Sequence, residues 1–148
     1  MSETDPFDLA RFIKAQAAVY PTVLEELSRG AKSSHWIWFI FPQLRGLGRS
    51  ETARRFGLAS IEEARAYLAH PVLGGRLREC VALMNAVEGK SAFEILGPPD
   101  DLKFRSCLTM FSMAAPDEPA FAEGLERYFA GKPDPATLDL LSQRPAAT

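Results

Sequence analysis

The chain has 148 residues, a usual length for one domain and enough to bury a core without a disulfide or metal. Its formal net charge of −2 excludes the broad cationic surface of a typical nucleic-acid-binding protein. Two cysteines are too few for a disulfide framework, and the longest apolar run, Trp36–Phe41, is far shorter than a membrane-spanning helix. Because Glu3, Asp5 and Pro6 are atypical of a secretory signal, we expect a cytoplasmic protein with no membrane partner.

Residues that start and stop helices recur along the whole chain. Proline behind a capping side chain marks a start, S-x-x-E forms a capping box, and glycine marks an end. In chain order these signals predict a helix that begins at Asp5-Pro6, followed by helices over 21–28, 50–55, 60–68, 72–87, 91–96, 101–115, 119–130 and 135–141. Asp100 is the expected N-cap of the helix over 101–115. The pair Gly74-Gly75 should weaken the first turn of the helix over 72–87 and could let another backbone approach closely.

These helices predict an all-α fold. We expect them to pack compactly, with orthogonal helix axes, in a single domain over 1–148. The ordered core would cover about 5–142, with short tails at both ends. The run from Ile37 to Phe41 is the one place with strand character, and it could form a short extended segment.

An aromatic segment, residues 32–43, combines large rings with polar groups. Its rings could simply be core, with the indole N–H groups bonded locally. The polar residues around the rings would also allow the segment to hold an anionic group beside a planar ring. The candidate binding residues here are Lys32, Ser34, His35, Trp36, Trp38 and Gln43. His35 is the one candidate catalytic residue, as an acid or base, although a structural role is more common for a lone histidine.

The helix over 101–115 is the second unusual segment. At 100° per residue Lys103 falls in its apolar arc, and the opposite arc carries Arg105, Ser106 and Thr109. The helix could be buried nearly all round, with its hydroxyls bonded to carbonyls one turn back. Alternatively, these four residues and the free amides of the first turn could bind an anion. Asp100 and Asp101 count against an anion there, since they could occupy that place themselves.

Other segments carry weaker signals. Arg54-Arg55 could be half solvated, or one of the two, with Arg54 as the candidate, could reach a phosphate with both arms of its guanidinium. Cys107 among aromatic neighbours is typical of an inert core thiol. The chain has no motif of a metalloprotease, zinc ribbon, serine hydrolase or EF-hand, so we expect neither a metal ion nor a cofactor.

Three strings carry a resemblance to a known family: residues 35–50 with HWIWFIFPQ, residues 64–74 with ARAYLAHPVLG, and residues 100–106 with DDLKFRS. In these the sequence resembles the bacterial domain-of-unknown-function 1810 family, from about Phe7 to Leu141. The resemblance implies a small, mainly α-helical fold and brings no catalytic residues, because the family's function is not established. Some members carry the label calpastatin, but inhibitors of that type resemble disordered repeat chains. The family usually has a serine where Cys107 stands, so a hydroxyl-dependent role would be lost at that position here.

Two functional hypotheses follow from the sequence. In the first, the aromatic segment and the helix over 101–115 form a site for a small anionic, planar ligand, such as a nucleotide or an ADP-ribose-like compound, which the protein could also process. In the second, the chain is a non-catalytic interaction module or a homo-oligomer, with no concave site near His35 and a broad apolar patch elsewhere. Binding to nucleic acid ranks third because of the net charge.

Overall fold

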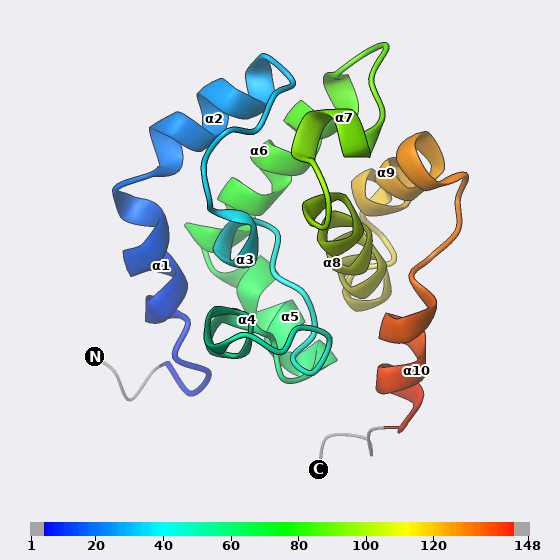
Figure 1. Cartoon of the computed structure of the whole chain (residues 1–148). Coiled ribbons are helices and arrows are strands. Elements are labelled where there is room, and N and C mark those ends of the chain that lie inside the picture. The colour runs from blue at the N-terminus through cyan, green and yellow to red at the C-terminus, as the bar shows by residue number, and fades with distance from the viewer. Residues whose placement is uncertain (1–4, 144–148) are drawn as a thin grey trace.

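The computed structural model describes residues 5–143, so the tails expected at both ends lie outside it. Within the described part the regular elements are all helices (Figure 1), which confirms the predicted all-α fold. They are α1 (Ala10–Ala17), α2 (Tyr20–Ser28), α3 (Ile37–Ile40), α4 (Glu51–Phe56), α5 (Ile61–Ala69), α6 (Leu73–Ala86), α7 (Ala92–Leu96), α8 (Asp100–Ala114), α9 (Pro119–Phe129) and α10 (Pro135–Gln143). None of the described helices is long and apolar enough to span a membrane.

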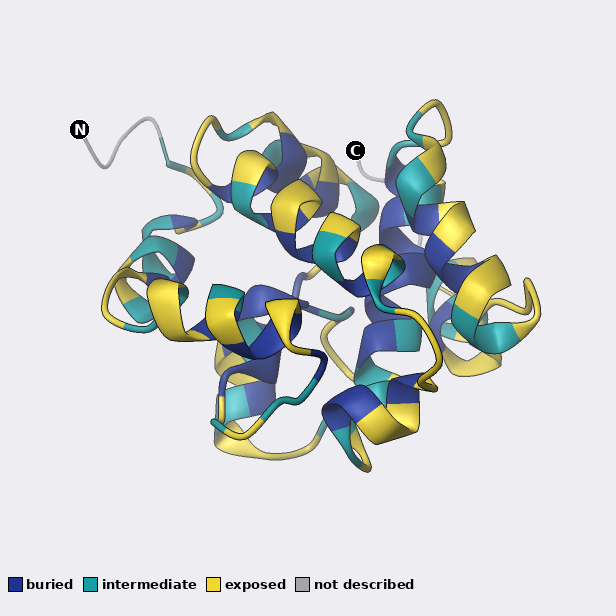
Figure 2. Ribbon diagram, turned by 90° about the horizontal axis from the view of Figure 1, so that it is seen from above, coloured by how far each residue is buried: buried dark blue, intermediate teal, exposed yellow. Residues whose placement is uncertain are grey.

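Helix α8 occupies the centre of the arrangement. It packs against α3, α5, α7, α9 and α10, while α6 packs against α2, α5 and α9. The buried faces of the helices turn toward one another and their exposed faces point outward (Figure 2). Because α8 meets neighbours on several sides, most of it is buried, although Leu102 and Met113 near its two ends are exposed.

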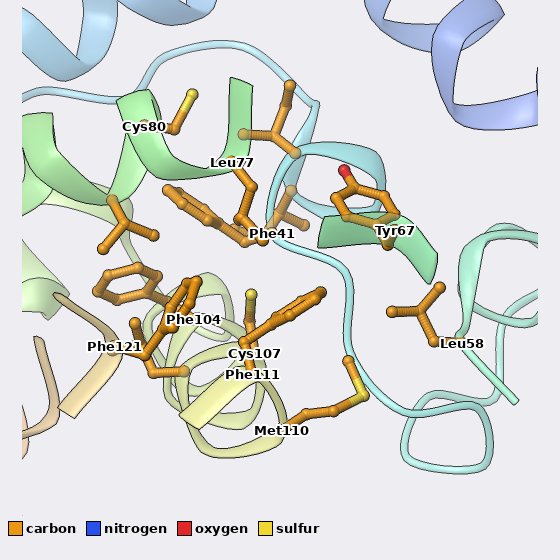
Figure 3. Close-up of a cluster of buried hydrophobic side chains, with 14 of the residues drawn as sticks. Phe41, Leu58, Tyr67, Leu77, Cys80, Phe104, Cys107, Met110, Phe111 and Phe121 are labelled. Atoms are coloured by element: carbon orange, nitrogen blue, oxygen red, sulfur yellow. The ribbon is translucent and has the colours of Figure 1, made fainter. Parts of the chain in front are cut away.

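Aromatic rings fill the space around α8 (Figure 3). The rings of Phe41 and Phe104 lie 4.7 Å apart, and Phe111 lies 5.6 Å from Phe121 and 5.7 Å from Tyr67, all measured between centroids. These five side chains are at most 1% exposed. Burial of such large apolar surfaces is the main force that holds the helices together.

Serine caps begin three of the helices where the sequence predicts them. The hydroxyls of Ser50, Ser60 and Ser91 each accept a hydrogen bond from the amide three residues later. At Ser91 the second half of the capping box also forms, because Glu94 accepts from the Ser91 amide at 2.8 Å. At Ser60 it does not, because Glu63 accepts from the Ala59 amide instead.

Three local predictions are wrong. The first helix does not begin at Asp5-Pro6: α1 begins at Ala10, and the Asp5 carboxylate accepts from the Leu9 and Ala10 amides across an intervening turn. The segment from Ile37 to Phe41 is not extended: residues 37–40 form the short helix α3. A run of apolar residues has no polar positions to define a period, and α3 packs against α1, α4, α6 and α8, so tertiary contacts set its conformation. Asp100 is not the N-cap of α8 either, because Pro99 holds that position and Asp100 lies in the first turn.

The close backbone approach predicted for the Gly74-Gly75 pair is found at Gly74. A Cβ atom on Gly74 would lie 2.1 Å from the carbonyl oxygen of Leu68, in the last turns of α5. At the next residue, Gly75, a Cβ would meet nothing within 4 Å. The close packing of α5 on α6 therefore depends on one glycine of the pair.

Candidate functional site

A cavity of about 380 Å³ lies between the loop that leads into α3 and the turn from α7 into α8. It brings together five of the predicted binding residues, which are Lys32, Ser34, His35, Trp38 and Lys103. The rest of its lining is Ser33, Leu96, Pro98, Pro99 and Asp100. Residues 32–38 and residues 96–103, which are far apart in the sequence, thus form one site.

Glu26 on α2 organises the loop that forms one wall of this cavity. One of its carboxylate oxygens accepts from the Ser33 amide at 2.9 Å, the Ser34 amide at 3.0 Å and the Trp36 indole N–H at 2.9 Å. The other accepts from the Ser34 hydroxyl at 2.6 Å. Burial alone would raise the pKa of this carboxyl, but the hydrogen bonds outweigh it and lower the pKa to about 2. Glu26 is 2% exposed, so the loop is built around a buried negative charge.

The sequence prediction missed Glu26. The signal that could have revealed it is its position on α2, beside Val23 and Leu27 on the buried face of the helix. A carboxylate on such a face needs hydrogen-bond donors from elsewhere in the chain.

Lys32 links this loop to α8. Its Nζ lies 2.7 Å from an Asp100 carboxylate oxygen, and the two side chains are only 6% and 17% exposed. The same ammonium lies 5.0 Å from the centroid of the Trp36 ring, and the Lys32 amide donates to the Ile95 carbonyl at 2.8 Å. The charge of Lys32 is therefore neutralised, and its first role at the cavity is to hold two walls together.

Lys103 also lines the cavity, and unlike Lys32 it has no carboxylate partner among the described residues. Its Nζ lies 5.1 Å from the centroid of the Trp38 ring, and no Asp or Glu of the described residues forms an ion pair with it. The Trp38 indole N–H is buried and has no hydrogen-bond partner within the described part of the chain. Both side chains also line a crevice of about 10 Å³ together with Gln43. Among the described residues, a cation without a counter-charge and a buried donor without an acceptor thus lie side by side.

Three backbone amides in the first turn of α8 are not available to this site. The Asp101 amide donates to the Gly97 carbonyl at 3.0 Å, and those of Leu102 and Lys103 donate to the Pro99 carbonyl at 3.0 and 3.2 Å. These groups are already bonded, so the positive charge at the cavity comes from side chains.

The family model described as "Protein of unknown function (DUF1810)" matches residues 6–141. The chain belongs to the DUF1810 family. Its fold is similar to the crystal structure of the conserved hypothetical protein Rv1873 from Mycobacterium tuberculosis, with a TM-score of 0.92 and 52% sequence identity over 94% of this chain and 99% of that one. No curated protein gives a significant match to the chain.

In this DUF1810 member, three further predicted residues of α8 lie away from the cavity, on the side of the helix that meets the segment before α10. Arg105 donates to the carbonyls of Lys132 and Pro133, both at 3.0 Å. The Ser106 hydroxyl donates to the Leu102 carbonyl at 3.1 Å, and the Thr109 hydroxyl donates to the Arg105 carbonyl at 2.8 Å. Each hydroxyl therefore bonds the carbonyl one turn back, which is the structural alternative that the sequence left open.

Two more predicted residues also lie apart from the ligand-sized space. Trp36 is fully buried, so its ring cannot stack on a ligand without a rearrangement of the core. Arg54 lines a different cavity, beside the N-terminal segment.

The chemistry that this DUF1810 site offers is binding by charge and shape. His35 is exposed on the wall, and no described residue holds its ring by a hydrogen bond. Cys80 and Cys107 are buried in the core, where burial raises the pKa of Cys80 to about 12 and that of Cys107 well above its usual value. Among the described residues no group of histidines, cysteines and carboxylates could hold a metal ion.

Proposed function

We propose that the protein binds a small ligand with an anionic group in the cavity beside Lys103. The observation that carries this proposal is the ammonium of Lys103, which lies on the cavity wall above Trp38 and has no carboxylate partner in the described chain. A charge in a partly buried position requires a counter-charge or water, and a ligand anion would supply the first. The cavity volume lies within the range of small-molecule sites.

The other lining residues supply the parts of a ligand site around this charge. Leu96, Pro98 and Pro99 form an apolar wall for the organic part of the ligand. The exposed side chains of Ser33 and His35 offer hydrogen bonds at the rim. This combination suits a nucleotide or an ADP-ribose-like compound, and His35 would be the acid or base if the bound compound is processed.

The competing proposal is an interaction or homo-oligomerisation module. It predicts no concave site near His35, so the cavity there supports ligand binding instead. The large hydrophobic side chains with the most exposure come from three different elements, the turn before α6 and the helices α7 and α8: Val72, Phe93, Leu102 and Met113.

A thermal-shift screen of nucleotides, ADP-ribose and sugar phosphates tests the proposal. A ligand at 100 times its Kd stabilises a protein by about 2.7 kcal/mol, which raises the Tm by several degrees. We expect this rise in the wild type and in Lys132→Ala, which removes the same charge from an exposed position away from the cavity. Lys103→Ala should lose it. No rise with any of these compounds, or an equal rise in Lys103→Ala, would contradict the proposal.

A further inference from the structure

A second cavity, which we call the arginine cleft, lies between the N-terminal segment and α4. Its volume is about 430 Å³, and it shares no lining residue with the cavity beside Lys103. Four of its seven lining residues are arginines, in a protein whose net charge is −2. The lining residues are Pro6, Phe7, Asp8, Arg11, Arg45, Arg54 and Arg55.

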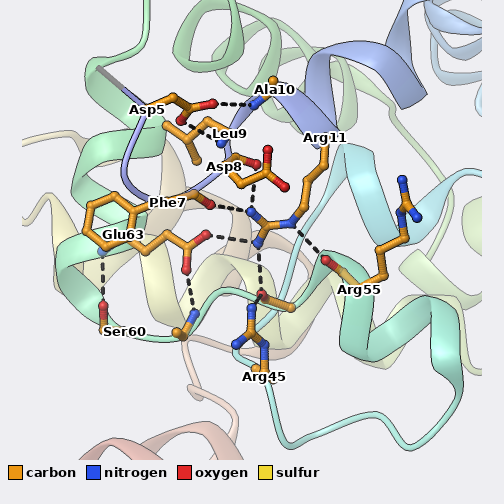
Figure 4. Close-up of polar contacts among 12 residues, drawn as sticks. Asp5, Phe7, Asp8, Leu9, Ala10, Arg11, Arg45, Arg55, Ser60 and Glu63 are labelled. Atoms are coloured by element: carbon orange, nitrogen blue, oxygen red, sulfur yellow. Dashed lines mark hydrogen bonds and ion pairs between the residues drawn. The ribbon is translucent and has the colours of Figure 1, made fainter. Parts of the chain in front are cut away.

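Arg11 fixes the two walls of the arginine cleft relative to each other (Figure 4). It donates to the carbonyls of Phe7 at 2.5 Å and Asp8 at 2.8 Å on one wall, and to that of Arg55 at 2.8 Å on the other. It also pairs with Glu63 at 2.9 Å, and the side chains of Arg11 and Glu63 are only 9% and 3% exposed. The charge of Arg11 is therefore neutralised, and its role is to hold the cleft open in one shape.

Arg54 and Arg55 carry the charge that remains available. Both are exposed in the last turn of α4, and neither forms an ion pair with a described carboxylate. The Arg55 guanidinium lies 5.5 Å from the centroid of the Phe56 ring, which limits the directions it can take. Both arginines also interact favourably with the dipole of α4, because they lie at its C-terminus. That interaction does not explain why they share a cleft with Arg11 and Arg45.

The one carboxylate in the cleft lining is Asp8, and its backbone conformation is unusual. Its φ of 53° lies in the left-handed region, which costs free energy for a residue other than glycine. The bond from Arg11 to the Asp8 carbonyl and that from the Asp8 amide to the Asp5 carbonyl hold this turn in place. The turn also brings Pro6 and Phe7 to the cleft wall, so the basic residues face an apolar surface.

We infer that the arginine cleft is a second binding site, for a small molecule that carries a phosphate or diphosphate group. The planar guanidinium groups of Arg54 and Arg55 match the oxygens of a phosphate, to which arginine bonds with two parallel N–H groups. Pro6 and Phe7 contact the organic part of the ligand. Because the cleft is separate from the cavity beside Lys103, this inference does not depend on the proposed function.

Titration of the protein with pyrophosphate, followed by amide NMR, tests the inference. We expect saturable shifts at residues 7–8 and 54–57, and no saturable shift of the Trp38 indole signal. Arg54→Ala/Arg55→Ala should weaken the affinity at least tenfold. Arg29→Ala/Lys132→Ala, which removes the same charge from exposed positions elsewhere, should keep the wild-type affinity.

Three outcomes would overturn the inference: no saturable shift up to roughly 10 mM pyrophosphate, which corresponds to binding too weak for a specific site; an equal loss of affinity in the two double variants; or shifts centred on Trp38. The apolar wall formed by Pro6 and Phe7 is tested by comparing two phosphate compounds. Phenyl phosphate should bind more tightly than inorganic phosphate if its ring contacts Pro6 and Phe7, and equal or weaker binding would contradict that contact. Both arginine side chains are exposed, so the variants should keep the wild-type Tm.

Discussion

The buried carboxylate of Glu26 makes the wall of the Lys103 cavity sensitive to a change of one charge. Glu26→Gln keeps the shape of the side chain and removes its negative charge. The amide oxygen can still accept from the Ser33 and Ser34 amides and the Trp36 indole, while the new NH₂ group donates to the Ser34 hydroxyl. Because hydrogen bonds to an ionised acceptor are stronger than those to a neutral one, we expect Glu26→Gln to destabilise the protein.

The magnitude follows from the pKa of Glu26. In the folded protein this pKa falls from its usual 4.5 to about 2. At about 1.4 kcal/mol for each factor of ten in proton affinity, ionisation of Glu26 contributes roughly 3 kcal/mol to stability at neutral pH. A carboxyl whose pKa is lower in the folded than in the unfolded state stabilises the folded protein at pH values above its unfolded pKa. The contribution of Glu26 is therefore full above about pH 5 and disappears as the pH falls through 2.

Urea unfolding of the wild type and Glu26→Gln, followed by circular dichroism, measures this contribution. We expect a difference in unfolding free energy of roughly 3 kcal/mol at pH 7 that narrows to roughly 1 kcal/mol at pH 3. Glu25→Gln is the matched control, because Glu25 is the next residue on α2 and its surface pair with Arg29 is worth at most about 1 kcal/mol. A difference that stays constant from pH 7 to pH 3, or equal effects at Glu25 and Glu26, would contradict a stabilising charge at Glu26.

Two further predictions concern contacts that position the site and the core, and urea unfolding measures both. Lys32→Met leaves the carboxylate of Asp100 largely buried without its partner, so it should cost about 3 kcal/mol, and adding Asp100→Asn should restore part of that loss. A further loss in the double variant would show that the pair is not coupled. Gly74→Ala should cost about 2 kcal/mol or more because its Cβ meets the Leu68 carbonyl, whereas Gly75→Ala should stabilise by about 0.5–1 kcal/mol. Equal effects at the two glycines would contradict the close approach.

The sequence predicts what local chemistry decides. The caps at Ser50, Ser60 and Ser91 involve residues three positions apart, so the chain itself shows them. The apolar run at Ile37–Ile40 contains no such pairing, and its helical turn depends on four neighbouring helices that the sequence does not reveal. Helix ends are likewise decided within one or two residues by packing, as the place of Asp100 shows.

The candidate site was predicted in part for the same reason. Lys32, Trp38 and Lys103 stand out because polar residues lie within apolar segments, and the structure brings them to one cavity. The ion pair between Lys32 and Asp100 joins distant parts of the chain, so spacing could not indicate it. On α8 the sequence distinguishes two arcs of side chains but does not show which neighbour each arc meets. Arg105 faces the segment before α10 and not the cavity, which the sequence could not predict.

The chain has two tryptophans, and their indole N–H signals in an NMR spectrum test the ligand site most directly. The Trp38 N–H is buried beside Lys103 and has no hydrogen-bond acceptor among residues 5–143, whereas that of Trp36 is bonded to Glu26 in the core. With the nucleotide or sugar phosphate that raises the Tm most, the Trp38 signal should shift and saturate while that of Trp36 stays in place, and Lys103→Ala should abolish the shift. If neither signal shifts, or if both shift alike in the wild type and in Lys103→Ala, the cavity beside Lys103 does not bind this ligand.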